Sequence, residues 1–502
     1  MKRIIAAAPV RNETRRFLNR WLEAVLRFAD RLVVLDDAGD DDTAEMCRRR
    51  GDRVIVHSLA QPSLLVQETR TRSLLWEHVR REARPGDWIA LLDADEIPSE
   101  PLIALRNTIL ALPDDIGRLD AKWAEMWTES HYRVDGLWSP WLTLLVRFED
   151  RPFCADPDLT PGLHVPRFPE YVGRLVPHPL DAPVLHLGYC RGDLREEKAA
   201  FYVAHNEGVH LAHARTILEP AKLAPLEALL TLPRVVLTVP IRNRAWAVPK
   251  LVENLSRLDY PDDRLRVRFV VNDSTDDTDA LLLAWRRTGM REHVEVVRLN
   301  LSDPAPPGEH QWWGPASDPG GPLRRMAKLR NSMLAELRDS NADVMLALDS
   351  DVLLHPQTIR HLAATGADIV SPVFWASWGL RMGPLFGGVR VAHGRVDIHH
   401  RLQAVQQGKR PQVWERGSSA SSEPWLMDLV FRSGLHRVGG LGAVTWIRKQ
   451  VALAGVSYDE VPNLPEDYCG EDRHFCVRAV CHGFDLWASS YLETHHRDEP
   501  DT

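Results

Sequence analysis

The chain reads IIAAAPVRN over residues 4–12 and VVLTVPIRN over residues 235–243. Each stretch is an apolar run that ends in Pro, an aliphatic residue and Arg-Asn. A short apolar run bounded by a polar turn is typical of a strand buried on both faces of a parallel sheet. We therefore expect two buried strands, and their similarity predicts an internal repeat.

Two more pairs of apolar runs follow in the same order, and each ends in acid. Residues 32–37 match residues 269–273, and residues 88–95 match residues 344–351. The offset between matching positions grows from 231 residues at the first pair to 256 at the third. The second copy is therefore expected to have longer loops.

Segments with apolar residues three and four apart lie between these runs, such as residues 15–28 and 323–338. This spacing predicts amphipathic helices, and Thr43 and Thr278 are expected to begin two more. Strands that alternate with helices predict a parallel, three-layer α/β sheet. The repeat thus predicts two α/β domains of one kind, over residues 1–217 and 234–502, joined by a proline-containing linker over 218–233.

Composition limits the classes of function. The 502 residues are 44% hydrophobic and carry a formal charge of -8, which is typical of a globular chain and does not favour nucleic acid as the main partner. We expect no transmembrane segment and no signal peptide. The six cysteines contain no CxxC pair, so free thiols in a cytoplasmic protein are expected.

The third pair of runs ends in Asp-x-Asp, at Asp93 and Asp95 and again at Asp349 and Asp351. The tripeptide occurs five times in the chain, but only these two copies directly follow an apolar run. At a strand end alternate side chains face the same way, so both carboxylates can face one site. Such oxygens suit Mg²⁺ or Mn²⁺, which could bridge to a diphosphate. The alternative is a solvated strand end or helix cap.

In this order the motifs resemble the GT-A fold glycosyltransferases, closest to family 2, in both halves of the chain. The resemblance implies that the acid after the second strand contacts the nucleotide base and that the first acid of Asp-x-Asp lies near ribose. The second acid, Asp95 or Asp351, would bind the metal. The implied donor-binding residues are Pro9, Arg11, Asp37, Asp93, Pro240, Arg242, Asp273, Arg330 and Asp349.

The second copy has further motifs of the family. Arg330 would lie near the diphosphate, as the cation of an Arg-Asn pair. Glu471 and Asp472 resemble the family's Gly-Glu-Asp stretch, which implies that Asp472 is the general base for the acceptor hydroxyl and that the transfer is inverting. A late histidine, His495 or His496, would bind the metal. The alternative for the acidic pair is a helix N-terminus stabilised by its dipole.

The first copy departs from this pattern. Its Asp-Ala-Asp-Glu run resembles family 2 relatives that modify lipopolysaccharide core, and His186 resembles their metal-binding histidine. No Glu-Asp stretch occurs, so the first copy lacks an assignable base. The C-terminal half also weakly resembles fungal mannan-polymerase glycosyltransferases, which use GDP-mannose. This resemblance implies that the donor nucleotide could be GDP as well as UDP.

These residues predict a metal-dependent glycosyltransferase, using Mn²⁺ or Mg²⁺, that moves a sugar from a UDP- or GDP-sugar to a glycan or glycoconjugate hydroxyl. Two complete sites would make it bifunctional. An alternative is one active C-terminal domain with a non-catalytic N-terminal module that binds a sugar nucleotide or the acceptor. A sugar-nucleotidyltransferase ranks lower, because neither first strand is followed by the glycine-rich loop that such enzymes use for a triphosphate.

Overall fold

The computed structural model divides by its internal contacts into two compact units, Met1–Thr231 and Leu232–Thr502. We call them the first and the second unit. The division falls within the range 218–233 that was predicted as a linker. The structure describes residues 2–63, 68–134, 140–154, 166–204, 215–301, 321–373, 433–438, 440–462, 470–492 and 494–496.

The first unit is built on a mixed sheet with the strand order β3-β2-β1-β4-β8-β6-β9-β5. Its strands are β1 (Ile4–Val10), β2 (Arg31–Asp36), β3 (Val54–Ser58), β4 (Trp88–Leu91), β5 (Glu96–Pro98), β6 (Arg118–Glu125), β7 (His131–Arg133), β8 (Trp141–Arg147), β9 (Pro177–His186) and β10 (Leu223–Pro225). Its helices are α1 (Leu18–Phe28), α2 (Thr43–Arg48), α3 (Glu68–Glu82), α4 (Glu100–Ala104), α5 (Arg106–Ala111), α6 (Gly192–Ala204), α8 (Glu227–Leu230) and the 3-10 helix η1 (Glu170–Arg174).

The second unit repeats this architecture with the strand order β13-β12-β11-β14-β18-β16-β19-β17. Its strands are β11 (Val235–Ile241), β12 (Leu265–Val271), β13 (Val294–Arg298), β14 (Val344–Leu348), β15 (Val352–Leu353), β16 (Ile369–Pro372), β17 (Leu435–Arg437), β18 (Val444–Arg448), β19 (Leu486–Ser489) and β20 (His495–His496). Its helices are α9 (Val248–Ser256), α10 (Thr278–Arg287), α11 (Gly321–Asp339), α12 (Thr358–Thr365), α15 (Lys449–Leu453), α16 (Glu471–Cys481) and the 3-10 helix η2 (Asp262–Arg264).

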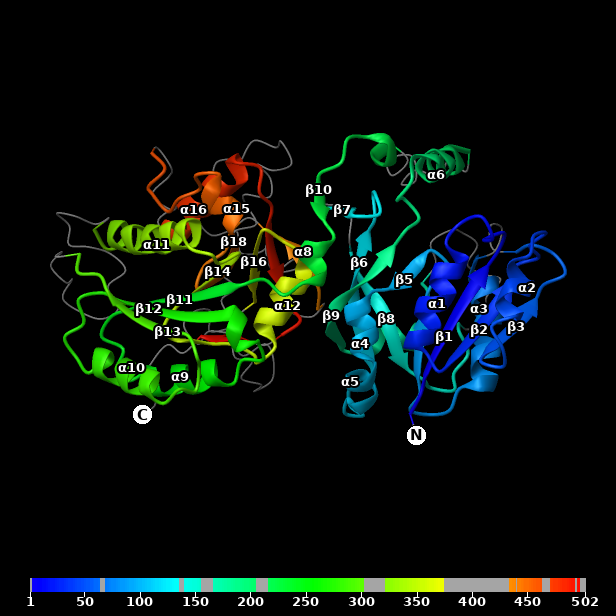
Figure 1. Cartoon of the computed structure of the whole chain (residues 1–502), viewed down its shortest axis with the longest axis horizontal. Helices are drawn as coiled ribbons and strands as arrows, with labels where there is room; N and C mark the ends of the chain where they lie inside the picture. The colour runs from blue at the N-terminus through cyan, green and yellow to red at the C-terminus, as the bar shows by residue number, and fades with distance from the viewer. Residues whose placement is uncertain are drawn as a thin grey trace, which may run out of the picture. The chain divides into compact units, whose positions relative to one another are not determined.

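Helices cover both faces of each sheet, and β1 and β11 are therefore buried along their whole length. In the second unit, α9 and α10 pack on one face, and α11, α15 and α16 pack on the other (Figure 1). In the first unit, α1, α2, α4 and α5 share one core, while α3 and η1 share the other. Both units are therefore three-layer α/β structures, and the predicted fold class is confirmed.

The predicted elements agree closely with the structure. The segment predicted as a helix over residues 15–28 forms α1, which begins at Leu18, and the segment 323–338 forms α11. Thr43 and Thr278 begin α2 and α10 as expected. The prediction of a wholly parallel sheet is wrong, because β8 and β18 run antiparallel to their neighbours. Antiparallel strands need no crossover helix, so this part of the sheet carries no alternating strand-helix signal.

Part of the predicted linker is paired to the first unit. Strand β10 runs antiparallel to β7, with Leu223 opposite Arg133.

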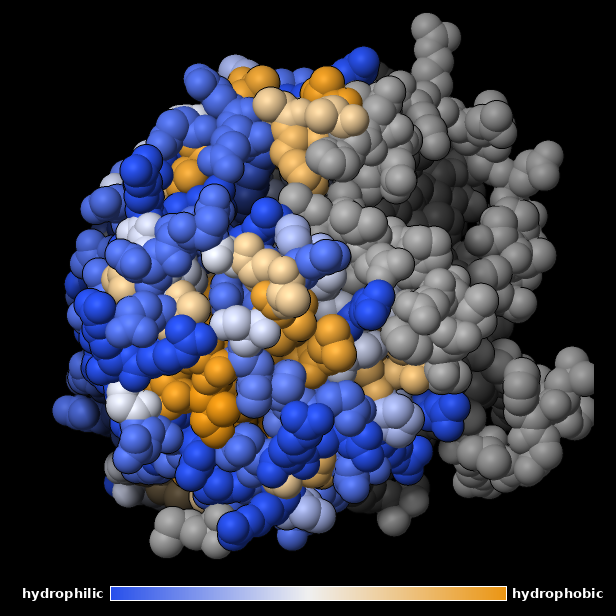
Figure 2. Space-filling view, turned by 90° about the vertical axis from the view of Figure 1, so that its right-hand side faces the viewer, coloured by the Kyte–Doolittle hydropathy of each residue, from blue (hydrophilic) through white to orange (hydrophobic). Residues whose placement is uncertain are grey.

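None of the described helices is both long and apolar enough to cross a membrane. The face drawn in Figure 2 is mostly hydrophilic where residues are coloured, with hydrophobic residues in a few separate patches.

Candidate functional site

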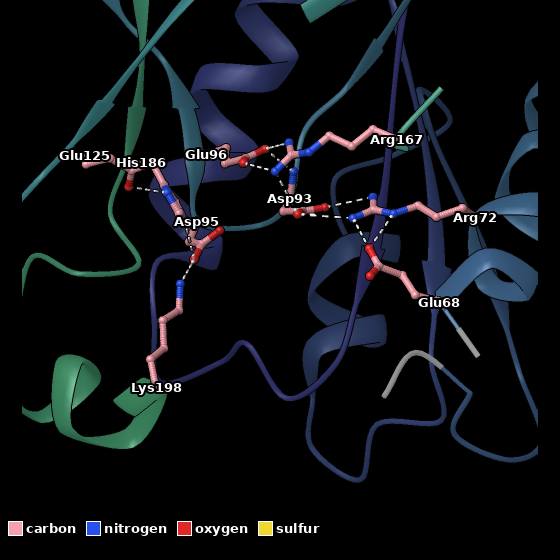
Figure 3. Close-up of polar contacts among 9 residues, drawn as sticks. All are labelled: Glu68, Arg72, Asp93, Asp95, Glu96, Glu125, Arg167, His186 and Lys198. Carbon is pink, nitrogen blue, oxygen red and sulfur yellow. Dashed lines mark hydrogen bonds and ion pairs between the residues drawn. The ribbon is translucent and has the colours of Figure 1, made fainter. Parts of the chain in front are cut away.

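The carboxyl end of β4 carries the Asp-x-Asp pair of the first unit (Figure 3). Asp93 is held by two guanidinium groups: Arg72 of α3 donates from Nη1 to Oδ1 at 3.0 Å, and Nη2 of Arg167 lies 3.4 Å from Oδ2. Burial opposes ionisation of Asp93, but the two arginines outweigh it and hold its pKa below the usual value. Asp93 is therefore a fixed carboxylate inside a charged network.

Asp95 faces a different pair of cations. Its Oδ2 lies 3.3 Å from Nε2 of His186 and 3.5 Å from Nζ of Lys198. Burial opposes ionisation of Asp95, but His186 and then Lys198 hold its pKa far below the usual value. The other ring nitrogen of His186, Nδ1, lies 2.6 Å from Oε2 of Glu125 on β6. Glu125 thus orients the imidazole so that Nε2 points at Asp95.

The contacts with Glu125 and Asp95 determine whether His186 is protonated. Burial disfavours the imidazolium, but the carboxylates of Glu125 and Asp95 outweigh burial and raise the pKa of His186 to about 10. A divalent ion would displace this proton, because a metal binds the neutral imidazole.

Gly188 tests whether a divalent ion fits beside these groups. A Cβ built on Gly188 would collide with Nζ of Lys198 and would lie 2.5 Å from Oδ2 of Asp95 and 2.8 Å from Nε2 of His186, so two donors and one ammonium converge where a side chain is missing. The 3.3 Å between these two atoms is close to the spacing of roughly 3 Å expected for neighbouring ligands with bonds of about 2.1 Å. Asp95 and His186 can thus supply two ligands to an ion that takes the place of the Lys198 ammonium, and the described residues contain no group of three or more His, Cys, Asp or Glu arranged to hold one.

The second unit has the same clamp on its first acid. Arg330 of α11 donates from Nη2 to Oδ1 of Asp349 at 2.9 Å. Its Nε donates to Oε1 of Glu471 at 2.9 Å and lies 3.5 Å from Oδ1 of Asp472. The structure therefore brings Asp349, Glu471 and Asp472 around one arginine, although they lie far apart in the sequence. The Arg330 side chain is only 3% exposed, so it holds these acids from within the protein.

The acidic pair at 471 and 472 also begins α16, as the alternative reading expected. Glu471 is buried, whereas the Asp472 side chain is 20% exposed. The two readings are compatible, because one helix end presents a buried acid to Arg330 and a more accessible acid beside it.

Asp351 faces a cation from another element. Nε of Arg244 lies 3.8 Å from its Oδ2, and Arg244 comes from the turn after β11. The matching residue of the first unit is Glu13, because both backbone amides donate to the threonine that begins the helix after the second strand, α2 or α10. Glu13 donates to Oγ1 of Thr43 at 2.7 Å, and Arg244 donates to Oγ1 of Thr278 at 2.8 Å.

Glu13 therefore places an acid where the second unit has a cation. Its side chain is 14% exposed, and its Oε2 has no hydrogen-bond partner among the described residues. Burial raises the pKa of Glu13 to about 7; Arg16 opposes this rise and Asp95 adds to it. Sequence reasoning noticed neither this residue nor the exchange of charge.

Backbone register relates His186 to one of the two late histidines. In the first unit β5 follows Asp95, and its first residue, Glu96, pairs with His186. In the second unit β15 follows Asp351, and its first residue, Val352, pairs with His496. Both pairings are antiparallel, so His496 holds the place of His186 and His495 does not. The side chains of His495 and His496 lie outside the described residues.

The predicted base-contacting acids lie in matching turns. Asp37 is fully buried and accepts from the backbone amide of Ser63 at 2.7 Å. Asp273 accepts from the backbone amide of Leu301 at 3.2 Å and from Asn272 at 3.0 Å. In each unit the acid thus fastens the loop after the third strand, a structural role that leaves a base contact untested.

The remaining donor-binding candidates surround the end of the first strand. Pro9 and Pro240 lie within β1 and β11, opposite Leu35 and Val270. Arg11 is half-buried after β1.

Arg242 follows β11, and its pKa is lowered by burial and by the nearby guanidinium of Arg325. Two cations that repel each other in this way suit an anion such as a diphosphate.

Arg72 was missed by the sequence analysis. It lies on the helix before the Asp-x-Asp strand, as Arg330 does, and each binds the first acid of its pair. The signal was present in the repeat: Arg72 precedes Asp93 by 21 residues, and Arg330 precedes Asp349 by 19. Lys198 received no role in the sequence analysis either.

Comparison with known proteins agrees with the architecture. Residues 232–380 match the family model described as "Glycosyltransferase family 25, N-terminal domain". The second unit therefore carries a glycosyltransferase domain. The sequence motifs suggested family 2, and the matched model belongs to another glycosyltransferase family. No comparison bears on the mannan-polymerase resemblance.

Curated relatives match a part of the chain. Human procollagen galactosyltransferase 2 is 30% identical over 149 residues, which are 29% of this chain and 23% of that protein. The bovine "probable inactive glycosyltransferase 25 family member 3" is 32% identical over 143 residues, which are 28% of this chain and 24% of that protein. The chain spans about a quarter of these relatives' length, and their names include active and inactive proteins. Activity must therefore be argued from the site residues.

Among solved structures, S. aureus TarS 1–349 in complex with UDP-GlcNAc is 17% identical, covers 53% of this chain and 59% of its own, and gives a TM-score of 0.30. The mannosyltransferase PcManGT from Pyrobaculum calidifontis, in complex with GDP-Man and Mn²⁺, is 16% identical, covers 60% of this chain and 68% of its own, and also gives 0.30. Likeness at this TM-score supports no statement about this chain.

Proposed function

We propose that this chain is a glycosyltransferase that transfers a sugar from a nucleotide-diphosphate donor to a hydroxyl acceptor, with one donor site in each unit. One observation carries the proposal: the same arginine-clamped Asp-x-Asp stands at the same strand end in both units. The copy at Asp349 and Asp351 lies inside the residues that match a glycosyltransferase family. An accidental acidic turn would not repeat with its arginine.

The donor is proposed to bind at the carboxyl ends of the first and fourth strands of the repeat, where ligands of open α/β sheets bind. In the second unit Arg242 and Arg325 supply positive charge for the diphosphate of a UDP- or GDP-sugar. Because one relative is a procollagen galactosyltransferase, UDP-galactose is the first donor to test and a protein-linked hydroxyl the first acceptor.

Asp95 and His186 in the first unit, and Asp351 and His496 in the second, are proposed to hold a Mn²⁺ or Mg²⁺ ion. Such an ion supplies charge neutralisation for the leaving diphosphate. Glu125 supports the first site by fixing the tautomer and the direction of His186.

In the second unit Asp472 is proposed to accept the proton of the acceptor hydroxyl, and a single displacement would invert the sugar's anomeric centre. Arg330 positions Asp472 and Asp349 relative to each other, because it contacts both carboxylates. Glu471 is the buried partner that holds the Arg330 side chain in place.

A second candidate keeps catalysis in the second unit alone. It is favoured by the composition of the first site, in which His186 and Lys198 already neutralise Asp95 and no counterpart of Asp472 has been found among the described residues. The first unit would then bind a donor or a glycan without transferring sugar. A sugar-nucleotidyltransferase remains a third, lower candidate.

The test uses the full chain with Mn²⁺ and a panel of UDP-galactose, UDP-glucose, UDP-N-acetylglucosamine and GDP-mannose, and it measures release of UDP or GDP. Asp95→Asn and Asp351→Asn are each expected to remove part of the release, and the double variant to lower it at least ~100-fold. Asp114→Asn and Asp339→Asn are the controls, because both side chains are largely exposed.

Three outcomes are distinguishable. Loss in both single variants supports two active sites. Loss in Asp351→Asn alone supports the second candidate, with one active unit. Full release by the double variant would show that neither Asp-x-Asp takes part, and the proposed function would be wrong.

A further inference from the structure

Lys198 of α6 lies beside Asp95, the second acid of Asp-x-Asp in the first unit. Its Nζ lies 3.5 Å from Oδ2 of Asp95, the same oxygen that Nε2 of His186 approaches to 3.3 Å. A Cβ built on Gly188 would collide with all three groups. The ammonium therefore stands at the point where the proposed metal ligands converge (Figure 3).

One carboxylate oxygen cannot serve an ammonium and a divalent ion at the same distance. An ammonium and a divalent ion held this close repel each other strongly in a partly buried site, where water screens charges less than in bulk. Lys198 must therefore leave Asp95 when an ion binds there, and it needs another anion to contact. A diphosphate is such an anion, and the donor would bring it to the same place.

The surroundings of Lys198 allow this movement. Its side chain is 29% exposed, and Nζ lies 4.2 Å from the centre of the Tyr189 ring, which supports the ammonium from one side. A cavity of ≈ 20 Å³ opens beside it, large enough for one water or one ion. The cavity is lined by Arg16, Asp95, Gly188, Leu194, Glu197 and Lys198.

We propose that Lys198 is the built-in cation of the first donor site, which neutralises Asp95 in the absence of donor and contacts the donor's diphosphate once a divalent ion is bound to Asp95. This inference rests on the proposed function of the first unit and names a new residue in it. It makes two measurable statements: Lys198 weakens the binding of the ion alone, and Lys198 strengthens the binding of a diphosphate alone.

The second unit supports the argument by contrast. There the cation facing the second acid is Arg244, which comes from the turn after the first strand. The first unit has Glu13 at that position, so a cation had to come from another element. Lys198 supplies it from the helix that follows β9.

The experiment uses the full chain in an Asp351→Asn background, so that the second unit contributes little to metal binding. Lys198→Met is compared with Lys222→Met, which alters an exposed lysine of the same unit. Mn²⁺ alone is titrated by electron paramagnetic resonance, and inorganic pyrophosphate without metal is titrated by calorimetry. Any pyrophosphate bound by the second unit is common to both variants. Lys198→Arg keeps the charge, and circular dichroism checks the fold of each variant.

Lys198→Met is expected to bind Mn²⁺ at least tenfold more tightly than Lys222→Met and pyrophosphate at least tenfold more weakly, while Lys198→Arg resembles the parent. Equal affinities in Lys198→Met and Lys222→Met would overturn the proposal and leave the donor site intact. If the parent binds neither probe in the first unit, the proposed function of that unit fails as well. Should Lys198→Met not fold, the proposal still fails if Lys198→Arg loses pyrophosphate binding.

Discussion

The two units share a strand order but place opposite charges at the third residue after the first strand. Glu13 and Arg244 make the same backbone hydrogen bond to a helix-starting threonine, yet one is an acid and the other a cation. The second acid of each Asp-x-Asp nevertheless faces a cation: Lys198 near Asp95 and Arg244 near Asp351. The position of the acids is thus common to both units, while the source of the balancing charge differs.

This difference shows which part of the site the fold determines. The acids follow strands β4 and β14, so any chain with this strand order must place them at the same edge of the sheet. The cations come from surrounding helices and turns, and those elements are free to vary. The first acid of each Asp-x-Asp accepts a hydrogen bond from an arginine of the equivalent helix, Arg72 in the first unit and Arg330 in the second.

The largest effect is expected from the clamp of the second unit. Arg330→Met would leave Asp349, Glu471 and Asp472 without their shared cation, and loss of one partner of a buried ion pair typically costs about 3–5 kcal/mol. Arg72→Met should cost less, because Arg167 also contacts Asp93. Chemical denaturation of both variants measures the difference.

Arg338→Met is the control for this comparison, since that side chain is 51% exposed and pairs only with its neighbour Asp339 in the described ion pairs. Equal losses of unfolding free energy in Arg330→Met and Arg72→Met would show that the two arginines contribute equally to stability. The proposed difference between the units would then be incorrect at this point.

The pH dependence of stability separates the units next. Glu13 has a folded pKa of about 7 against a usual value of 4.5, so its ionisation adds no cost below pH 4.5 and progressively destabilises the fold as the pH rises to 7. Glu13→Gln stays neutral and should gain up to about 3 kcal/mol over the natural chain at pH 8, but almost nothing at pH 4.5. Urea denaturation at both pH values measures this gain.

Glu45→Gln is the matched control, because that side chain is 49% exposed in the same unit. A gain for Glu13→Gln that is equal at both pH values would show that Glu13 is not held neutral by its surroundings.

The backbone register of β15 and β20 predicts different outcomes for the two late histidines. In an Asp95→Asn background, His496→Asn should lower nucleoside diphosphate release about 100-fold, which corresponds to about 2.7 kcal/mol, whereas His495→Asn should leave most of it. The reason is that His496, opposite Val352, holds the place of His186. Mn²⁺ binding by the same variants should follow the same order, and the reverse order would refute the equivalence.

The smallest effect is expected at Gly188. A methyl group there would push Asp95 and His186 apart, because both have short side chains whose atoms lie within 2.8 Å of the added carbon. In an Asp351→Asn background, Gly188→Ala should weaken Mn²⁺ binding about tenfold, because the two proposed ligands no longer converge. Gly173→Ala is the control, since an added methyl meets nothing within 4 Å. Unaltered Mn²⁺ binding in Gly188→Ala would place the ion elsewhere.

Much of this architecture could be predicted from the chain. The apolar runs at residues 4–10 and 235–241 form the buried central strands, and the ordered acidic run-ends located both Asp-x-Asp turns correctly. The antiparallel β8 and β18 were not predicted, because they lack the alternation with helices on which the parallel prediction was based. Arg72 was overlooked for a similar reason: an arginine on a helix is common, and only its contact with Asp93 distinguishes it.

By itself the sequence determined that this protein contains one α/β architecture twice and that acids end the same strands in each copy. It could do so because apolar periodicity and the order of motifs are properties of neighbouring residues. Only the tertiary structure decided which charges meet: Arg330 with Asp472, Lys198 with Asp95, and Glu13 in the place of Arg244. Electrostatic pairing depends on distance through space, and residues more than a hundred positions apart in the chain reach that distance only after the sheet has formed.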